Sequence, residues 1–186
     1  MGTIAIPGLV AGTWSLDAAH SEVGFVVRHM MVTKVRGTFQ RFEGAIEIAP
    51  DPLQSTVTVT IDVTSINTDN ADRDAHLRSA DYFESEKFPS MTYRSTRVRD
   101  DGGDVLVDGD LTLHGVTKPV TLNVEVNGVQ KDPWGGTRVG LSAEGELSRR
   151  DFGIDINMPL DGGGVVVGDK IKLVLELQAV LQTPAS

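Results

Sequence analysis

The stretch Thr56-Val57-Thr58-Val59-Thr60-Ile61-Asp62-Val63 alternates polar and apolar side chains without a break. Successive side chains of an extended strand point to opposite faces, so this alternation predicts a strand with one wet face and one dry face. Thr, Val and Ile are also the β-branched residues that suit a pleated, half-buried surface.

The same period of two recurs along most of the chain. The dry positions of five further runs are Val23, Phe25, Val27 and His29; Val105, Val107, Leu111 and Leu113; Val120, Leu122 and Val124; Val139, Leu141 and Ala143; and Ile171, Leu173 and Leu175. Turn sequences such as Asp100-Asp101-Gly102-Gly103 and Asn127-Gly128 separate the runs. Strands joined by short turns predict an antiparallel meander rather than alternating strand–helix units.

The parity of the dry positions slips once. Phe39 lies on odd parity, whereas Phe42 and Ile46 lie on even parity. A slip of one residue with apolar side chains on both sides predicts a β-bulge near Gln40-Arg41.

One segment lacks the period of two. Residues 70–79 are polar and contain good helix formers, so they predict a short helix with Thr68, Asp69 or Asn70 as its N-cap. Asp81-Tyr82-Phe83 adds a further turn, which gives a helical segment around residues 70–84.

Length, composition and charge set outer bounds. The 186 residues, 40% of them hydrophobic and 23% charged, suit one domain at residues 13–183 behind a frayed N-terminal arm of residues 1–12. A formal charge of −9 disfavours nucleic acid and, on average, anionic membranes as partners. No run approaches the ~20 apolar residues of a membrane span, and the start carries no Lys or Arg. We therefore expect no integral membrane segment, no signal peptide and a cytoplasmic location.

Eight or nine antiparallel strands in a chain of this length can form a sandwich or a closed up-and-down barrel. Closure removes both sheet edges. An eight-stranded barrel is wide enough for one small or elongated ligand if its lining does not fill it. Periodicity alone does not separate a hollow barrel from a filled one.

The residues that carry chemistry form no catalytic or metal-binding pattern. His20 and His29 are nine positions apart and fall on opposite faces of a regular strand, while His76 and His114 lie far away in the sequence. The chain has no cysteine. We therefore predict no metal site, no cofactor and no catalytic residue.

Two sets of polar residues remain open to two interpretations. His29 has the parity of the dry face, so it is either a hydrogen-bonded core histidine or a polar contact in a cavity. Arg149 and Arg150 are either surface ion-pair partners or contacts for an anionic head group. Arg73 either lies on a solvated helix face or contacts such a head group.

The order of several short motifs resembles the YceI-like family. The motifs are Trp14-Ser15-Leu16-Asp17, residues 20–29 (HSEVGFVVRH), Val35-Arg36-Gly37-Thr38-Phe39, Arg73-Asp74-Ala75-His76-Leu77, Asp81-Tyr82-Phe83, Phe88-Pro89, residues 109–118 (GDLTLHGVTK), Arg150-Asp151-Phe152-Gly153-Ile154 and Val167-Gly168-Asp169. Together they span roughly residues 13–181, and their number and order make the match specific.

The resemblance implies an all-β fold, an antiparallel eight-stranded lipocalin-like up-and-down barrel with a long internal cavity and the short helical segment around residues 70–84. It also implies binding, sequestration or transport of a long-chain isoprenoid-type lipid, such as a polyisoprenoid or isoprenoid quinone, by a homodimer without catalysis. A fatty-acyl lipid is hard to separate from these ligands because a methylene more or less changes binding little.

The resemblance and the dry strand faces together give a candidate tunnel lining. Its members are Val23, Phe25, Val27, His29, Phe39, Phe42, Ile46, Ile61, Phe83, Phe88, Met91, Tyr93, Leu111, Leu113, Leu122, Leu141 and Phe152. The candidate head-group contacts are Arg73, Arg149 and Arg150.

Two other functions stay open. The first is an enzyme that acts on an amphiphilic lipid with His29 as base, which requires an inward carboxylate or a tyrosine such as Tyr93 nearby. The second is a stress-related interaction module with a filled barrel. The wet faces, rich in Thr, Asp and Glu, show no evident basic or aromatic patch for a partner, which disfavours the second.

Overall fold

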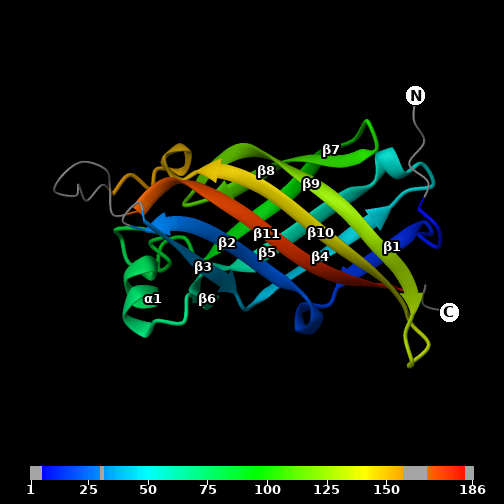
Figure 1. The fold of residues 1–186 in the computed structure, drawn as a ribbon, viewed down its shortest axis with the longest axis horizontal. Coiled ribbons are helices and arrows are strands. Elements are labelled where there is room, and N and C mark those ends of the chain that lie inside the picture. The colour runs from blue at the N-terminus through cyan, green and yellow to red at the C-terminus, as the bar shows by residue number, and fades with distance from the viewer. Residues whose placement is uncertain (1–5, 30–31, 157–166, 183–186) are drawn as a thin grey trace.

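The computed structural model describes residues 6–29, 32–156 and 167–182, with the backbone but not the side chain of His29. In these ranges the chain forms one antiparallel sheet of eleven strands, with one α-helix, α1 (Ala71–Arg78), at its end (Figure 1). The strands are β1 (Gly12–Leu16), β2 (Glu22–His29), β3 (Thr33–Phe39), β4 (Phe42–Ile48), β5 (Thr56–Asp62), β6 (Ile66–Asn67), β7 (Ser90–Asp101), β8 (Asp104–Leu113), β9 (Val116–Lys131), β10 (Thr137–Ser148) and β11 (Val167–Leu181). Short 3-10 helices occur at η1 (Ala18–His20), η2 (Pro52–Gln54), η3 (Val63–Ser65) and η4 (Arg149–Phe152).

The sheet closes on itself because β1 pairs with β4 on one side and with β11 on the other. Three strands of the barrel are interrupted, and each consists of two consecutive segments, namely β1 with β2, β3 with β4, and β5 with β6. With each of these pairs counted as one strand, the described residues form a closed antiparallel barrel of eight strands, so the predicted fold class is confirmed.

The break between β3 and β4 lies at the predicted irregularity. Gln40 and Arg41 leave the ladder, and their N–H groups instead donate to the carbonyl of Ser65 (3.2 Å) and to its hydroxyl (3.0 Å). Phe39, before the break, is part of the buried core cluster, and Phe42, after it, packs against the same cluster. The break therefore lets both phenylalanines face inward despite their opposite parity.

The helix α1 confirms the predicted helical segment. Asn70 is the N-cap, and its side-chain oxygen accepts a hydrogen bond from the Arg73 N–H at 2.9 Å. The chain then turns back, and the N–H of Phe83 donates to the Leu77 carbonyl at 2.9 Å. This segment lies at one end of the barrel (Figure 1), which we call the helix end. No helix within the described ranges is both long and apolar enough to cross a bilayer.

The described part of the N-terminal arm makes a few contacts with the barrel. The Leu9 N–H donates to the Ile6 carbonyl at 3.1 Å, and the indole N–H of Trp14 donates to the Val10 carbonyl at 3.0 Å. Leu9 also packs against the buried cluster around Trp14. Because the arm lies at the opposite end of the barrel from α1 (Figure 1), we call this the arm end.

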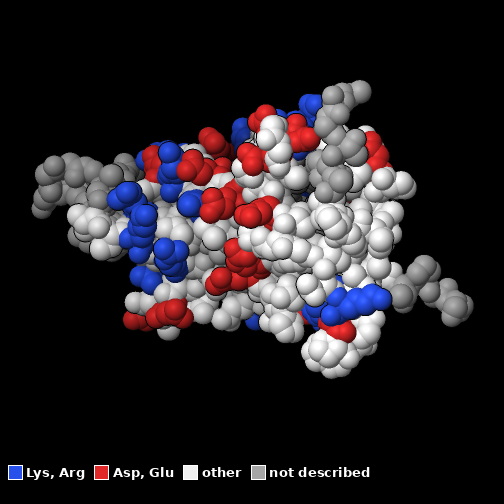
Figure 2. All heavy atoms as spheres, turned by 45° about the vertical axis from the view of Figure 1, so that its right-hand side comes forward, with Lys and Arg blue, Asp and Glu red and all other residues white. Residues whose placement is uncertain are grey.

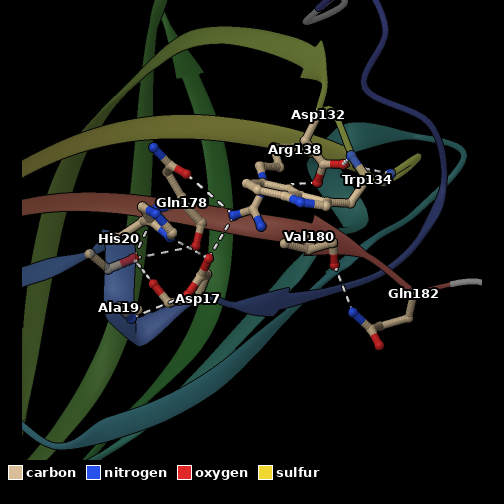
Figure 3. A network of polar contacts seen from close by, with 11 residues as sticks. Asp17, Ala19, His20, Asp132, Trp134, Arg138, Gln178, Val180 and Gln182 are labelled. Atoms are coloured by element: carbon tan, nitrogen blue, oxygen red, sulfur yellow. Dashed lines mark hydrogen bonds and ion pairs between the residues drawn. The ribbon is translucent and has the colours of Figure 1, made fainter.

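A polar network ties together the strands where the barrel closes (Figure 3). Nη1 of Arg138 on β10 lies 2.6 Å from Oδ2 of Asp17, which follows β1, and its Nε lies 2.9 Å from Oδ2 of Asp132 in the β9–β10 turn. Hydrogen bonds from Arg138 and then His20 lower the pKa of Asp17 to about 2. These charges are paired with one another, and the network links the end of β1 to β10 and to the β9–β10 turn.

Candidate functional site: an apolar tunnel

The inward faces of the strands enclose a cavity of about 270 Å³. Its wall extends from the arm end, at Ile6 and Leu9, to the helix end, at Leu77 and Phe83. Small-molecule sites in proteins commonly enclose roughly 300–1,000 Å³. A cavity near the lower limit of that range, with walls at both ends of the barrel, is narrow and elongated.

Most of the predicted lining residues lie on the cavity wall, and all of these except Phe83 occupy inward positions of a strand. They are Val23, Phe25, Val27, Phe39, Ile46, Ile61, Phe83, Met91, Tyr93, Leu111, Leu113, Leu122 and Leu141.

Three predicted lining residues do not reach the cavity. Phe42 packs into the core just after the break in its strand. Phe88 instead contacts the ring of His114, with 5.0 Å between ring centroids. Phe152, only 1% exposed, is buried in the turn η4. Phe88 and Phe152 lie outside regular strands and Phe42 begins one, so strand parity gave poor guidance at these positions.

The structure does not place the side chain of His29. Its backbone pairs with Thr33 and Val167 at the end of β2. The position of the imidazole relative to the cavity therefore stays a prediction.

Several wall residues were missing from the predicted lining. They include Ile6, Leu9, Trp14, Leu16, Leu77, Val139, Ile171, Leu173 and Leu175. The last four had the correct parity and could have been included on that signal. Ile6 and Leu9 precede the first strand, where no periodic pattern indicates an inward position.

Two glycines make room for aromatic rings along the wall. A Cβ atom at Gly37 would lie 2.3 Å from Cζ of Phe25, and one at Gly109 would lie 2.4 Å from Cζ of Tyr93. Each ring therefore lies close against the backbone of a neighbouring strand, where any larger residue would push it aside. The glycines thus help to preserve the open space in the barrel.

The cavity wall is almost entirely hydrocarbon. Its few polar side chains include Ser55, Tyr82, Tyr93 and Arg149, and no carboxylate or imidazole belongs to the lining among the described residues. The Tyr93 hydroxyl lies 2.9 Å from the carbonyl of Val120, and burial raises the pKa values of both tyrosines. Both phenols therefore stay neutral, and the wall suits an apolar chain rather than a charged group.

Arg149 is the one head-group candidate on the cavity wall. It is 4% exposed, and its guanidinium donates to the carbonyls of Ile154 (2.7 Å), Gly168 (3.1 Å) and Val167 (3.2 Å). Its Nη2 also lies 3.2 Å from Oδ1 of Asp169. These contacts join η4 to β11, so the guanidinium is engaged in closing the helix end.

The other two head-group candidates lie away from the cavity wall. Arg150 Nε is 3.0 Å from Oδ1 of Asp169, and both side chains are exposed. Arg73 donates to the hydroxyl and the carbonyl of Thr68, at 2.8 and 2.7 Å. The structure therefore does not bring the three arginines together at one anion site. The described residues also contain no group of three or more His, Asp or Glu placed to hold a metal ion.

Comparisons with known proteins agree with this architecture. The model of the YceI-like domain family matches residues 14–179. Protein YceI of Escherichia coli O17:K52:H18 is 40% identical over 176 residues, which cover 93% of this chain and 89% of that protein. The Campylobacter jejuni YCEI protein superposes with a TM-score of 0.71 at 31% identity, over 90% of this chain and 97% of that one.

A more distant structure shares the fold. It is a polyisoprenoid binding domain from Saccharophagus degradans, with a TM-score of 0.68 at 20% identity, over 93% of this chain and all (100%) of that one. The family match covers most of the chain, and the identity to Protein YceI extends over nearly the same length. This protein therefore belongs to the YceI-like domain family.

Proposed function

We propose that the protein binds and carries a long-chain isoprenoid-type lipid inside the barrel. The observation that carries this proposal is the hydrocarbon-lined cavity that extends between the two ends of the barrel. The polyisoprenoid binding domain with the same fold supports it by analogy.

The energy of such binding comes from the tail. Burial of one methylene contributes roughly 0.8 kcal/mol, so a five-carbon isoprene unit contributes up to about 4 kcal/mol before the costs of ordering the chain. A wall with so few polar groups discriminates head groups weakly. Polyisoprenoid, isoprenoid quinone and fatty-acyl lipids should therefore differ mainly through the length and shape of their tails.

The wall favours binding over catalysis. An enzyme acting on the lipid needs a general base within hydrogen-bond reach of the reacting atom. Tyr93 was the suggested partner for His29, but its hydroxyl faces backbone carbonyls and its raised pKa keeps its proton in place. If His29→Ala abolished turnover of an added isoprenoid lipid, the enzyme alternative would regain support.

A series of isoprenoid quinones with increasing tail length tests the proposal. We expect affinity to rise with each added unit and to level off when the tail fills the cavity. Ala143→Phe places a ring on the inward face of β10, so the affinity should stop rising at a shorter tail length than in the unaltered protein. Asn123→Phe, at an exposed position of β9, is the matched control and should leave the series unchanged. Affinity that does not depend on tail length would contradict the proposal.

The homodimer and the cytoplasmic location remain part of the proposal. Sedimentation equilibrium of the purified protein and fractionation of cells that express it are the measurements that decide them.

A further inference from the structure

The outer face of β2 and β3 carries three exposed cations. Arg28, Lys34 and Arg36 all occupy outward positions, and we call this group the basic ledge. Lys170 and Lys172 flank it on the adjacent strand β11. Figure 2 shows Lys and Arg side chains gathered at the left-hand end of the molecule, over these strands. The expectation that the wet faces carry no basic patch was therefore wrong.

The pairing of the strands sets like charges side by side. Arg28 lies directly opposite Lys34 in the β2–β3 ladder, and Arg36 lies opposite Val26. In the part of the chain that the structure describes, none of the three ledge cations forms an ion pair. Like charges placed directly opposite each other destabilise a sheet. The three cations weaken the sheet and have no anionic partner within the described residues, so they suit an anionic partner from outside the chain.

The acids on the β10 and β11 side of the ledge do not neutralise it. Glu146 and Glu144 on β10 face the flanking lysines Lys170 and Lys172, each at 3.8 Å. Asp169 is engaged by arginines of η4. The strand β11 separates β10 from the ledge, which places those glutamates roughly 10 Å away across two inter-strand spacings. At physiological ionic strength charges beyond about 8 Å are largely screened, so the ledge is locally positive despite the net charge of −9.

The basic ledge also lies beside one end of the cavity. On the inward face of β2 and the adjacent strand β11, Val27, Val167 and Ile171 line the cavity wall. Val167 pairs with the last residue of β2, and Arg149 holds its carbonyl at the helix end. A surface that contacts the ledge would therefore also meet the helix end of the barrel.

We propose that the basic ledge docks the helix end of the barrel onto a bilayer that contains anionic phospholipid. The choice of a bilayer over other anions rests on the proposed function, because a long isoprenoid tail is almost insoluble in water and must be collected or delivered at a membrane. Nucleic acid fits less well, since three cations on a strongly acidic chain offer few phosphate contacts.

Vesicle sedimentation tests the ledge directly. We expect the protein to bind vesicles of phosphatidylcholine with phosphatidylglycerol, to bind pure phosphatidylcholine much less, and to lose the difference in high salt. Replacing Arg28, Lys34 and Arg36 together by Gln should weaken binding to the anionic vesicles about a hundredfold, since each cation near such a surface contributes about fivefold.

A charge-matched control variant replaces three exposed cations on other walls. Arg94, Lys118 and Lys131 changed to Gln alter the net charge by the same amount and should leave vesicle binding within about twofold. Circular dichroism melting of both variants verifies that each is folded.

Two results would overturn the docking proposal. One is equal loss of vesicle binding in both variants, which would show an effect of net charge alone. The other is no preference of the unaltered protein for anionic vesicles, including the case in which the ledge binds an acidic protein instead. The vesicles contain no isoprenoid, so either result leaves lipid uptake by the cavity, measured separately by native mass spectrometry, as an independent question.

Discussion

Two pairs of neighbouring strands, the β2–β3 wall and the β7–β8 wall, are both apolar on the inside of the barrel but differ in how their outer charges are arranged. The β2–β3 wall and the β7–β8 wall both line the cavity with apolar side chains. Outside, Arg28 lies opposite Lys34 on the first wall, whereas Arg99 on the second forms a two-pronged ion pair with Asp108 at 2.7 and 2.8 Å. The inner faces must match because they share one cavity, while the outer faces are free to differ. The comparison indicates that charge pairing stabilises one wall and that the other wall keeps its charges available.

The largest expected effect lies on the inner face of the β2–β3 wall. Phe25→Asp buries a carboxylate without a partner on the cavity wall, which should lower the free energy of unfolding by about 3 kcal/mol or more and abolish lipid uptake. On the outer face of the same strand, Arg28→Gln should change the free energy of unfolding by less than about 0.5 kcal/mol. Urea unfolding measures this free energy for both variants. Unaltered unfolding and lipid uptake in Phe25→Asp would mean that β2 faces the other way.

A smaller effect is expected where a glycine supports a ring. Gly37→Ala on the first wall and Gly109→Ala on the second should each cost about 1–3 kcal/mol, because the new methyl group overlaps Phe25 or Tyr93. Gly140→Ala is the control, since its Cβ would meet its nearest neighbour, Asn127, at 3.8 Å. Urea midpoints that fall equally in all three variants would argue against close packing of the rings on these glycines.

The stability that the Arg99–Asp108 ion pair gives to the β7–β8 wall should decrease in acid. Hydrogen bonds from Arg99 and then Thr121 lower the pKa of Asp108 from 3.8 to about 2. The lowered pKa means that the contribution of this carboxylate to stability is complete above pH 3.8 and is lost as the pH falls through about 2. Asp108→Asn should therefore melt a few degrees lower than the unaltered protein near pH 6, and the difference should shrink as the pH falls from 4 towards 2.

Arg28→Gln supplies the comparison for the acid response on the unpaired wall, because the ledge contains no carboxylate. Its melting difference should stay constant over the same pH range. A melting difference for Asp108→Asn that is constant with pH would show that the ion pair adds nothing to stability.

The smallest expected effect on stability comes from reversing one charge on the outer face of each wall. Lys34→Glu places opposite charges across from each other on the first wall and should raise the free energy of unfolding by about 0.5 kcal/mol while it weakens vesicle binding. Asp110→Lys places a second cation opposite Arg94 on the paired wall and should lower the free energy of unfolding by a similar amount. If Lys34→Glu gains no stability, the like charges of the ledge carry no cost.

The period of two predicted most of the long strands and their inner faces, but it did not identify β1 or β7. Val23, Leu122 and Leu141 all lie where their parity placed them. The hollow interior could not be predicted from that pattern, because a filled barrel has the same alternation. Its open space depends on which side chain meets which glycine across strands, as Tyr93 does over Gly109.

Other features depend on contacts that no local pattern encodes. Leu9 reaches the cavity from the N-terminal arm, and Phe88 instead packs on the ring of His114 after the helical segment. The basic ledge was within reach of the sequence, since Arg28 and Lys34 have the parity opposite to that of the dry positions in their segments. Their direct opposition follows only from the register of β2 and β3.

The most direct test of the account is native mass spectrometry of the protein purified without detergent and again after incubation with a long-tailed isoprenoid quinone. We expect one added mass per chain that matches a long-chain lipid, and we expect that Phe25→Asp does not acquire it. A bare protein mass in both samples, from a chain that melts cooperatively, would contradict the claim that this cavity is built to hold a lipid tail.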